Sequence, residues 1–225
     1  MSDDVVTAGG AGAAASSGSG AAGGTAGGAA ASVGTAGGET PELTFVEVTD
    51  PEHIAELANF ADSIFREHFS KLHSPEKVDY LCHYLLGTGT LISAIADEGY
   101  EYYFADIAGS GGSSGGGDVA GGSSGEGEPV HAGFVGIKAY EDHLFLSKLY
   151  LASEWRGRGL GRAEFEFVKG RARELGLPKI RLTCARDNRS SIAAYHHLGC
   201  EIVGESDTEV GDGIEMNDYI IEYAL

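Results

Sequence analysis

The spacing of apolar residues divides the chain into segments of two different periods. Two early segments have the period of amphipathic helices, and each begins with a capping residue followed by proline, at Asp50-Pro51 and Ser74-Pro75. Two later helices are expected from Leu160 to Leu175 and from Arg189 to Leu198, each followed by a glycine. The apolar pattern therefore predicts four helices.

Between these helices lie apolar runs rich in aromatic and β-branched residues, which favour strands. We expect strands at 43–49, 100–107, 130–140, 143–151 and 179–185, with two more between 201 and 225 around Gly211-Asp212-Gly213. The resulting order is β, α, α, β, β, β, α, β, α, β, β. This order predicts an α+β chain with a mixed sheet.

Two low-complexity stretches interrupt the pattern. Residues 1–41 consist mainly of Ala, Gly, Ser and Thr, and residues 108–128 are rich in Gly and Ser. Glycine at this density loses much backbone entropy on folding and buries little side chain. We therefore expect a disordered tail at 1–41 and one domain at 42–225, with 108–128 inserted as a flexible loop between two strands of a hairpin.

The distribution of charge says more than the formal net charge of −19. The acidic total disfavours nucleic acid as a partner. The segment from Lys148 to Arg189, however, holds 11 of the 15 basic residues and 5 of the 34 acidic ones. A basic region in an acidic protein suits an anionic cofactor and a cationic substrate. The excess of acidic residues is explained equally well if it only keeps the protein soluble.

Several classes of protein are disfavoured by composition. The three cysteines are odd in number and have no C-x-x-C spacing, which fits a reduced compartment. The eight histidines show no metal-ligand spacing, so no metal is expected. We see neither a basic, apolar leader nor an apolar run of about 18 residues, so we expect no signal peptide and no membrane association. A cytoplasmic location is the resulting expectation.

The strongest chemical signal is the run Arg156-Gly157-Arg158-Gly159-Leu160-Gly161-Arg162, which lies between a predicted strand and a predicted helix. Backbone N–H groups and the helix dipole at such a turn form an anion site, and three arginines add charge. A tight turn with solvated arginines is the simpler alternative. The run lacks the Gly-Lys-Ser/Thr ending of a Walker A loop, and its spacing and late position disfavour a dinucleotide fingerprint.

A second motif gives this turn a context. The turn matches Arg/Gln-x-x-Gly-x-Gly/Ala, and Asn188-x-x-Ser-Ile-x-x-Tyr195-x-x-x-Gly199 follows it. Together the two motifs resemble the GCN5-related N-acetyltransferase (GNAT) family. Ser191 and Cys200 depart from the family pattern, where Ala and Phe are usual. The resemblance implies the GNAT fold, a mixed sheet of about seven strands flanked by about four helices. The segments Phe65–Phe69 and Gly211–Glu222 resemble the bacterial spermidine/spermine acetyltransferase branch.

The resemblance also implies a binding mode for acetyl-CoA as co-substrate. Its pyrophosphate would lie on the turn from Arg156 to Arg162. The backbone of Leu149, Tyr150 and Leu151 would contact the pantetheine arm and the thioester carbonyl. Asn188 would hydrogen-bond the pantetheine arm, and it is also suited to cap the following helix.

Tyr195 would protonate the departing CoA thiolate, because a thiolate leaves more easily when it is protonated. The alternative is a core aromatic, since Ile192, Tyr195 and Leu198 share one helical stripe. The attacking amine must also lose a proton. The candidate bases are four side chains, each of which is equally explained as a surface residue: Glu67, Glu141, Asp142 and His143.

The sequence thus predicts transfer of an acetyl group to a primary amine, by direct attack in a ternary complex. A polyamine or another small cationic amine suits the acidic charge, and a protein or peptide amine is the alternative. A non-catalytic module that senses acetyl-CoA would keep the turn but would not need Tyr195. A nucleotide-binding oxidoreductase is disfavoured by the motif spacing. The oligomeric state stays open, although homodimers are common in the family.

Overall fold

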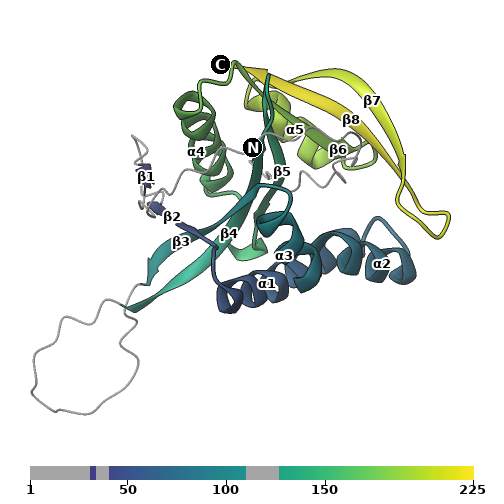
Figure 1. Cartoon of the computed structure of the whole chain (residues 1–225), viewed down its shortest axis with the longest axis horizontal. Coiled ribbons are helices and arrows are strands. Elements are labelled where there is room, and N and C mark those ends of the chain that lie inside the picture. Colours follow the sequence, from purple (N-terminus) through teal and green to yellow (C-terminus); the bar gives the residue numbers. More distant parts are fainter. Residues whose placement is uncertain (1–30, 34–40, 110–126) are drawn as a thin grey trace, which may run out of the picture.

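A mixed sheet of eight strands organises the chain (Figure 1), in the order β1-β2-β3-β4-β5-β6-β8-β7. The structure is a computed structural model that describes residues 31–33, 41–109 and 127–225. The strands are β1 (Ala31–Val33), β2 (Leu43–Glu47), β3 (Tyr100–Gly109), β4 (Gly127–Ala139), β5 (Leu144–Leu151), β6 (Lys179–Ala185), β7 (Glu201–Glu209) and β8 (Glu215–Ala224). The helices are α1 (Pro51–Phe69), α2 (Pro75–Leu86), α3 (Thr88–Ala96), α4 (Leu160–Glu174) and α5 (Arg189–His197).

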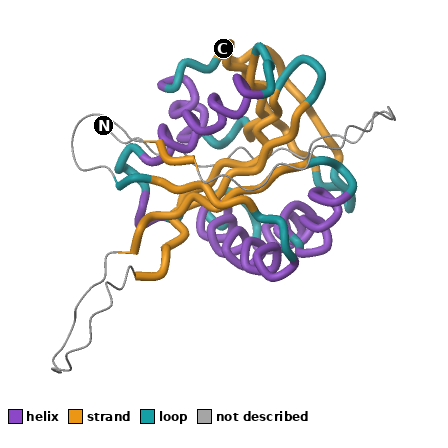
Figure 2. The backbone as a smooth tube through the Cα atoms, turned by 60° about the vertical axis from the view of Figure 1, so that its left-hand side comes forward, coloured by secondary structure: helices purple, strands orange, loops and turns teal. Residues whose placement is uncertain are grey.

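The helices lie on the two faces of this sheet (Figure 2), and each face has its own buried cluster. Helices α1, α2 and α3 pack on one face, around aromatic residues that include Phe65, Phe134 and Tyr150. Helices α4 and α5 pack on the other face, with Phe165, Val168 and Tyr195 in its core. The predicted α+β class with a mixed sheet is confirmed.

Among the described strands, β5 and β6 form the one parallel pair, and their pairing is short. Leu144, Phe145 and Leu146 pair with Ile180, Arg181 and Leu182, and the register ends there. Residues 147–151 of β5 and 183–185 of β6 therefore have no ladder bonds to each other. Backbone groups at such an opening remain available to a ligand that enters between the strands.

Local sequence signals place the helix ends as predicted. The Asp50 side chain accepts hydrogen bonds from the backbone N–H groups of Glu52 and His53, at 3.1 and 3.0 Å. Ser74 accepts one from the backbone N–H of Lys77 at 3.4 Å. The strand expected at 179–185 is observed with the same bounds. None of the helices in the described part of the chain is long and apolar enough to cross a membrane.

The described residues contain three elements that the pattern did not predict, one of which is a short 3₁₀ helix at Ser153–Trp155. Helix α3 adds a fifth helix, and the short strand β1 pairs with β2 inside the segment expected to be a tail. The structure does not describe residues 1–30, 34–40 and 110–126. The expected disorder and the division into tail, domain and insert therefore stay predictions. Strands β3 and β4 pair as far as Gly109 and Gly127, which confirms the hairpin on either side of the insert.

Candidate functional site

The turn after β5 has the backbone geometry that an anion site needs. Gly157 and Gly159 have φ angles of +71° and +78°, a left-handed conformation that favours glycine. Gly159 is the N-cap of α4, and no side chain within the described part of the chain caps that helix. The first-turn N–H groups of α4 and the positive end of its dipole therefore face the turn.

The three arginines of the turn have different positions. The Arg156 side chain is 13% exposed; its Nε donates to the carbonyl oxygen of Leu151 at 3.0 Å, and its Nη1 lies 3.5 Å from Glu67 Oε1. The Arg158 guanidinium lies 4.8 Å from the centre of the Trp155 ring. Arg158 and Arg162 are exposed. Arg156 thus fastens the turn to the end of β5, whereas the other two leave their charge at the surface.

The predicted strand positions and Asn188 lie on either side of the β5–β6 opening. Leu149, Tyr150 and Leu151 are fully buried in the half of β5 that pairs with β4 but not with β6. Asn188 follows the end of β6 and is 2% exposed. Its Oδ1 accepts from the backbone N–H of Ser191 at 3.3 Å, so it caps α5 as the sequence suggested.

Tyr195 on α5 is a core aromatic, as its helical stripe predicts, and its predicted role as proton donor stays a prediction. Its ring is completely buried in the core on this face of the sheet, and the Phe165 ring lies edge-on to it at 6.4 Å. Its hydroxyl nevertheless has no hydrogen-bond partner among the described residues. Burial raises the pKa of Tyr195 well above its usual value, which keeps the phenol neutral. A neutral phenol without a hydrogen-bond partner is chemically able to donate its proton.

Glu164 is a functional candidate that the sequence analysis missed. It lies on α4 with no exposed surface, and neither carboxyl oxygen has a hydrogen-bond partner within the described residues. Burial raises the pKa of its carboxyl well above the usual value, and the group lies close enough to influence Tyr195. The sequence contains a signal for this buried carboxyl, because Glu164 stands four residues after Leu160 and so lies on the apolar stripe of the helix.

The structure separates the four base candidates. Glu141, Asp142 and His143 precede β5, whereas the turn follows it. At about 3.3 Å per residue, the seven steps along β5 put these side chains about 23 Å from Leu151. These three candidates therefore lie at the end of β5 that is far from the turn. Glu67 alone lies near the turn, in its ion pair with Arg156.

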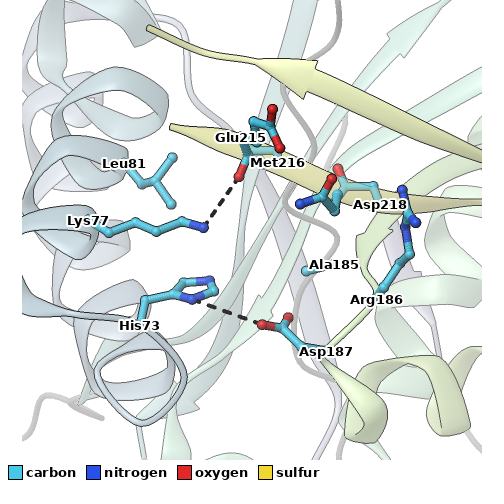
Figure 3. Close-up of a pocket in the computed structure, with 10 residues that line it drawn as sticks. His73, Lys77, Leu81, Ala185, Arg186, Asp187, Glu215, Met216 and Asp218 are labelled. Carbon is cyan, nitrogen blue, oxygen red and sulfur yellow. Dashed lines mark hydrogen bonds and ion pairs between the residues drawn. The ribbon is translucent and has the colours of Figure 1, made fainter. Parts of the chain in front are cut away.

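A cavity of about 220 Å³ opens on the face covered by α2 (Figure 3). It lies between the start of α2, the end of β6 and the start of β8. Ten residues line it: His73, Lys77, Leu81, Ala185, Arg186, Asp187, Glu215, Met216, Asn217 and Asp218. The sequence analysis did not identify these residues, because they come from three segments far apart in the chain. No group of three or more described His, Cys, Asp or Glu residues could hold a metal ion.

Comparisons with known proteins agree on one family. The family model described as "Acetyltransferase (GNAT) family" matches residues 59–200. The PaiA N-acetyltransferase of Thermoplasma acidophilum, solved with coenzyme A, is 14% identical with a TM-score of 0.55, over 80% of this chain and 99% of that one. A search of curated proteins gave no match.

Two further solved structures share the fold. A Rhodopseudomonas palustris protein described as a GCN5-related N-acetyltransferase is 14% identical with a TM-score of 0.60, over 85% of this chain and 100% of that one. The ribosomal-protein-S18-alanine N-acetyltransferase of Escherichia coli is 17% identical with a TM-score of 0.50, over 81% and 93%. At these identities the structural likeness extends to the fold alone.

Proposed function

The chain belongs to the GNAT family of acetyltransferases and is an acetyl-CoA-dependent N-acetyltransferase, and from this premise we propose that it acetylates a small primary amine by direct attack in a ternary complex. The observation that carries the proposal is the β5–β6 opening, which begins beyond Leu146 and leads to the glycine turn. An elongated ligand with a pyrophosphate at one end and a thioester at the other suits this arrangement.

The proposed acetyl-CoA site extends from the turn into the opening. The backbone N–H groups of 157–161 would bind the pyrophosphate, with Arg158 and Arg162 supplying charge from the surface. Arg156 would contribute indirectly, by holding the turn in place, since its guanidinium is bonded to Leu151 and Glu67. The backbone of Leu149, Tyr150 and Leu151 would contact the pantetheine and the thioester carbonyl. Asn188 would hydrogen-bond the pantetheine while it caps α5.

Tyr195 is the proposed proton donor to the sulfur. When the amine attacks the thioester carbonyl, the C–S bond breaks and its electron pair stays on sulfur. The buried phenol has no competing hydrogen-bond partner among the described residues, so its proton is available to the thiolate. Its fully buried position also keeps water away from the leaving group.

The cavity beside β8 is the proposed acceptor pocket. Three of its residues are carboxylates, Asp187, Glu215 and Asp218, which favour a cationic amine. Its volume of about 220 Å³ is below the 300–1,000 Å³ of most ligand pockets, so it fits a slender amine such as one end of a polyamine. A lysine side chain or a peptide amine is equally slender and is the alternative.

The function is tested by measuring free thiol released from acetyl-CoA with spermidine, butylamine, free lysine and a lysine-containing peptide. We expect turnover with a small amine. Tyr195→Phe should lower kcat about 10²-fold and leave the Kd for acetyl-CoA within twofold, since the phenol contacts the sulfur only as it leaves. Binding of acetyl-CoA without turnover on any amine would favour the sensing module. Turnover with the peptide alone would replace the small amine by a protein acceptor.

A further inference from the structure

We propose that Asp218 is the general base of the transfer: it binds the acceptor as an ammonium ion and takes its proton. This inference rests on the proposed function, because it names a residue in the same acceptor pocket. It is carried by a group of buried polar side chains on the sheet face covered by α1 and α2. We call this group the acceptor-face cluster; its members are Lys148, Tyr150, Thr183 and Asp218.

The strand registers place the four side chains on one face. Lys148 and Tyr150 are two residues apart on β5, so they point the same way. Asp218 pairs with Ala185, and Thr183 lies two residues before Ala185 on β6, so Thr183 and Asp218 also share a face. The charge of Asp218 influences the pKa values of both Lys148 and Tyr150, which places it close to the two β5 side chains across the opening.

Three polar atoms of the cluster are buried and under-satisfied. Among the described residues, the hydroxyls of Tyr150 and Thr183 and the Oδ1 atom of Asp218 lack a hydrogen-bond partner within normal distance, although the Thr183 hydroxyl is near enough to Asp218 to lower the pKa of its carboxyl. Buried polar atoms are favoured when they are hydrogen-bonded, so a ligand that bonds to these atoms would be stabilised here. An alkylammonium offers three N–H donors and no acceptor. Two hydroxyl oxygens and a carboxylate are the acceptors it needs.

The cluster is reached through the acceptor pocket. Asp218 is 5% exposed, yet it lines the cavity together with Ala185 (Figure 3). Asp187 and Glu215 also line the cavity and are nearer its solvent side, since both are exposed. A cationic amine would pass these two carboxylates before its nitrogen reaches Asp218.

The cations around the pocket are mostly paired with other groups. Arg186 forms ion pairs with Glu205 and Asp207 on β7. Lys77 donates to the carbonyl oxygen of Glu215 at 3.3 Å. These contacts hold both cations at the wall of the pocket, away from its floor.

Two further groups complete the charges that face Asp218. Burial lowers the pKa of His73, which lies 4.0 Å from Asp187, so this imidazole is neutral at pH 7. Lys148 is the buried cation of the cluster. Gly136 makes room for it, because a Cβ there would lie 3.2 Å from Lys148 Cγ and 2.6 Å from the Tyr102 ring.

The electrostatics suit a base that works near neutral pH. Burial raises the pKa of Asp218 to about 6, although the Thr183 hydroxyl and the positive charges of Lys148 and Arg186 oppose the rise. Burial also lowers the pKa of Lys148 to about 8. Asp218 is therefore ionised at pH 7 and is more basic than an exposed aspartate. A base is most effective when its pKa lies close to the working pH.

The proton transfers balance as follows. The bound ammonium gives one proton to Asp218, which releases it to solvent through the cavity. The neutral amine attacks the thioester carbonyl, the C–N bond forms, and the C–S bond breaks with its electron pair on sulfur. Tyr195 donates its proton to the sulfur and recovers one from the nitrogen. The products are the amide, CoA thiol and one proton in solution.

The test compares the pH dependence of kcat/KM in wild type and Asp218→Asn, with spermidine and butylamine as probes. We expect wild-type activity to fall below pH about 6. Asp218→Asn should lose about 10²-fold or more at pH 7 and lose this acidic limb, with the Kd for acetyl-CoA unchanged. Asp142→Asn, at an exposed site about 23 Å along β5, is the matched control and should behave as wild type.

Lys148→Met supplies an independent variant. It removes a positive charge that lowers the pKa of Asp218, so the acidic limb should move to higher pH. An unmoved limb would contradict the proposal even if Asp218→Asn failed to fold. Wild type that binds acetyl-CoA but acetylates no amine would overturn the proposed function and this inference together. An active Asp218→Asn that keeps the limb would overturn the inference alone.

Discussion

A Cβ atom on Gly133 would lie 2.4 Å from Oε1 of Glu164. The same atom would lie 2.3 Å from the carbonyl oxygen of Tyr150. The missing side chain on β4 thus makes room for a buried carboxyl from α4, next to the strand proposed to contact the thioester. The first turns of the helix that begins at the glycine turn are thereby packed directly against the β4–β5 pair.

Gly133→Ala should destabilise the protein by about 1–3 kcal/mol, because a methyl group there meets backbone as well as a side chain. Thermal unfolding should show a Tm lower by about 2–4 °C for each kcal/mol. Gly204→Ala on β7 is the matched control, since its Cβ would meet only the Ile220 side chain, at 3.5 Å. Equal Tm values for the two variants would show that Glu164 has room to move.

Glu164→Gln should stabilise the protein more at pH 8 than at pH 5. Burial raises the pKa of Glu164 in the folded state well above the unfolded value of 4.5. The folded protein therefore keeps a proton that the unfolded chain has released, and stability from the neutral carboxyl is lost as the pH rises above 4.5. Glutamine does not titrate and avoids this loss.

Urea unfolding at the two pH values measures this difference, with Glu154→Gln as control at an exposed position of the 3₁₀ turn before Arg156. The control should change the free energy of unfolding little at either pH. If Glu164→Gln has the same effect at pH 5 and pH 8, the carboxyl is not buried in its neutral form.

Gly159→Ala should weaken acetyl-CoA binding and cost about 1–2 kcal/mol of stability, because φ is +78° at this N-cap. The strain would tilt the N–H groups proposed to bind the pyrophosphate. Gly170→Ala in the same helix has nothing within 4 Å of its Cβ and should be neutral or stabilising by up to about 1 kcal/mol. Calorimetric titration measures the Kd for CoA and thermal unfolding measures Tm, and both should be impaired in Gly159→Ala but not in Gly170→Ala.

Arg156→Lys and Arg162→Lys should have different effects despite the equal change in residue type. A lysine at 156 cannot place a donor where Nε now bonds the Leu151 carbonyl oxygen, so we expect a loss of about 1 kcal/mol in stability without ligand. Arg162 is exposed, so its replacement should leave Tm unchanged and raise the Kd for CoA, because an ammonium keeps the charge but cannot make the paired N–H contacts of a guanidinium with a phosphate. Equal Tm values for the two variants would show that the hydrogen bond from Arg156 to the Leu151 carbonyl oxygen does not stabilise the protein.

Much of the fold could be predicted from local signals. The caps at Asp50 and Ser74, and the glycines that end α4 and α5, act within a few residues, so one sequence window contains the whole cause. Helix α3 was missed because its nine residues include Gly89 and its N-cap, Gly87, has no side chain to cap it. Its stability comes from packing Leu91 and Ala94 on the core, which no local pattern reveals.

The candidate site also combines features that local sequence predicts with features that depend on the tertiary structure. The glycine turn and the Asn188 cap could be predicted from the sequence by itself, because their geometry depends on glycine φ angles and on neighbouring backbone N–H groups. Only the tertiary structure shows which carboxylate is buried beside a cation. The sequence analysis named Asp142 among the candidate bases and did not single out Asp218, but strand order and register put Asp218 beside Lys148 in the acceptor-face cluster. Burial among side chains from several strands then raises the pKa of Asp218, and this effect cannot be read from any one segment of the sequence.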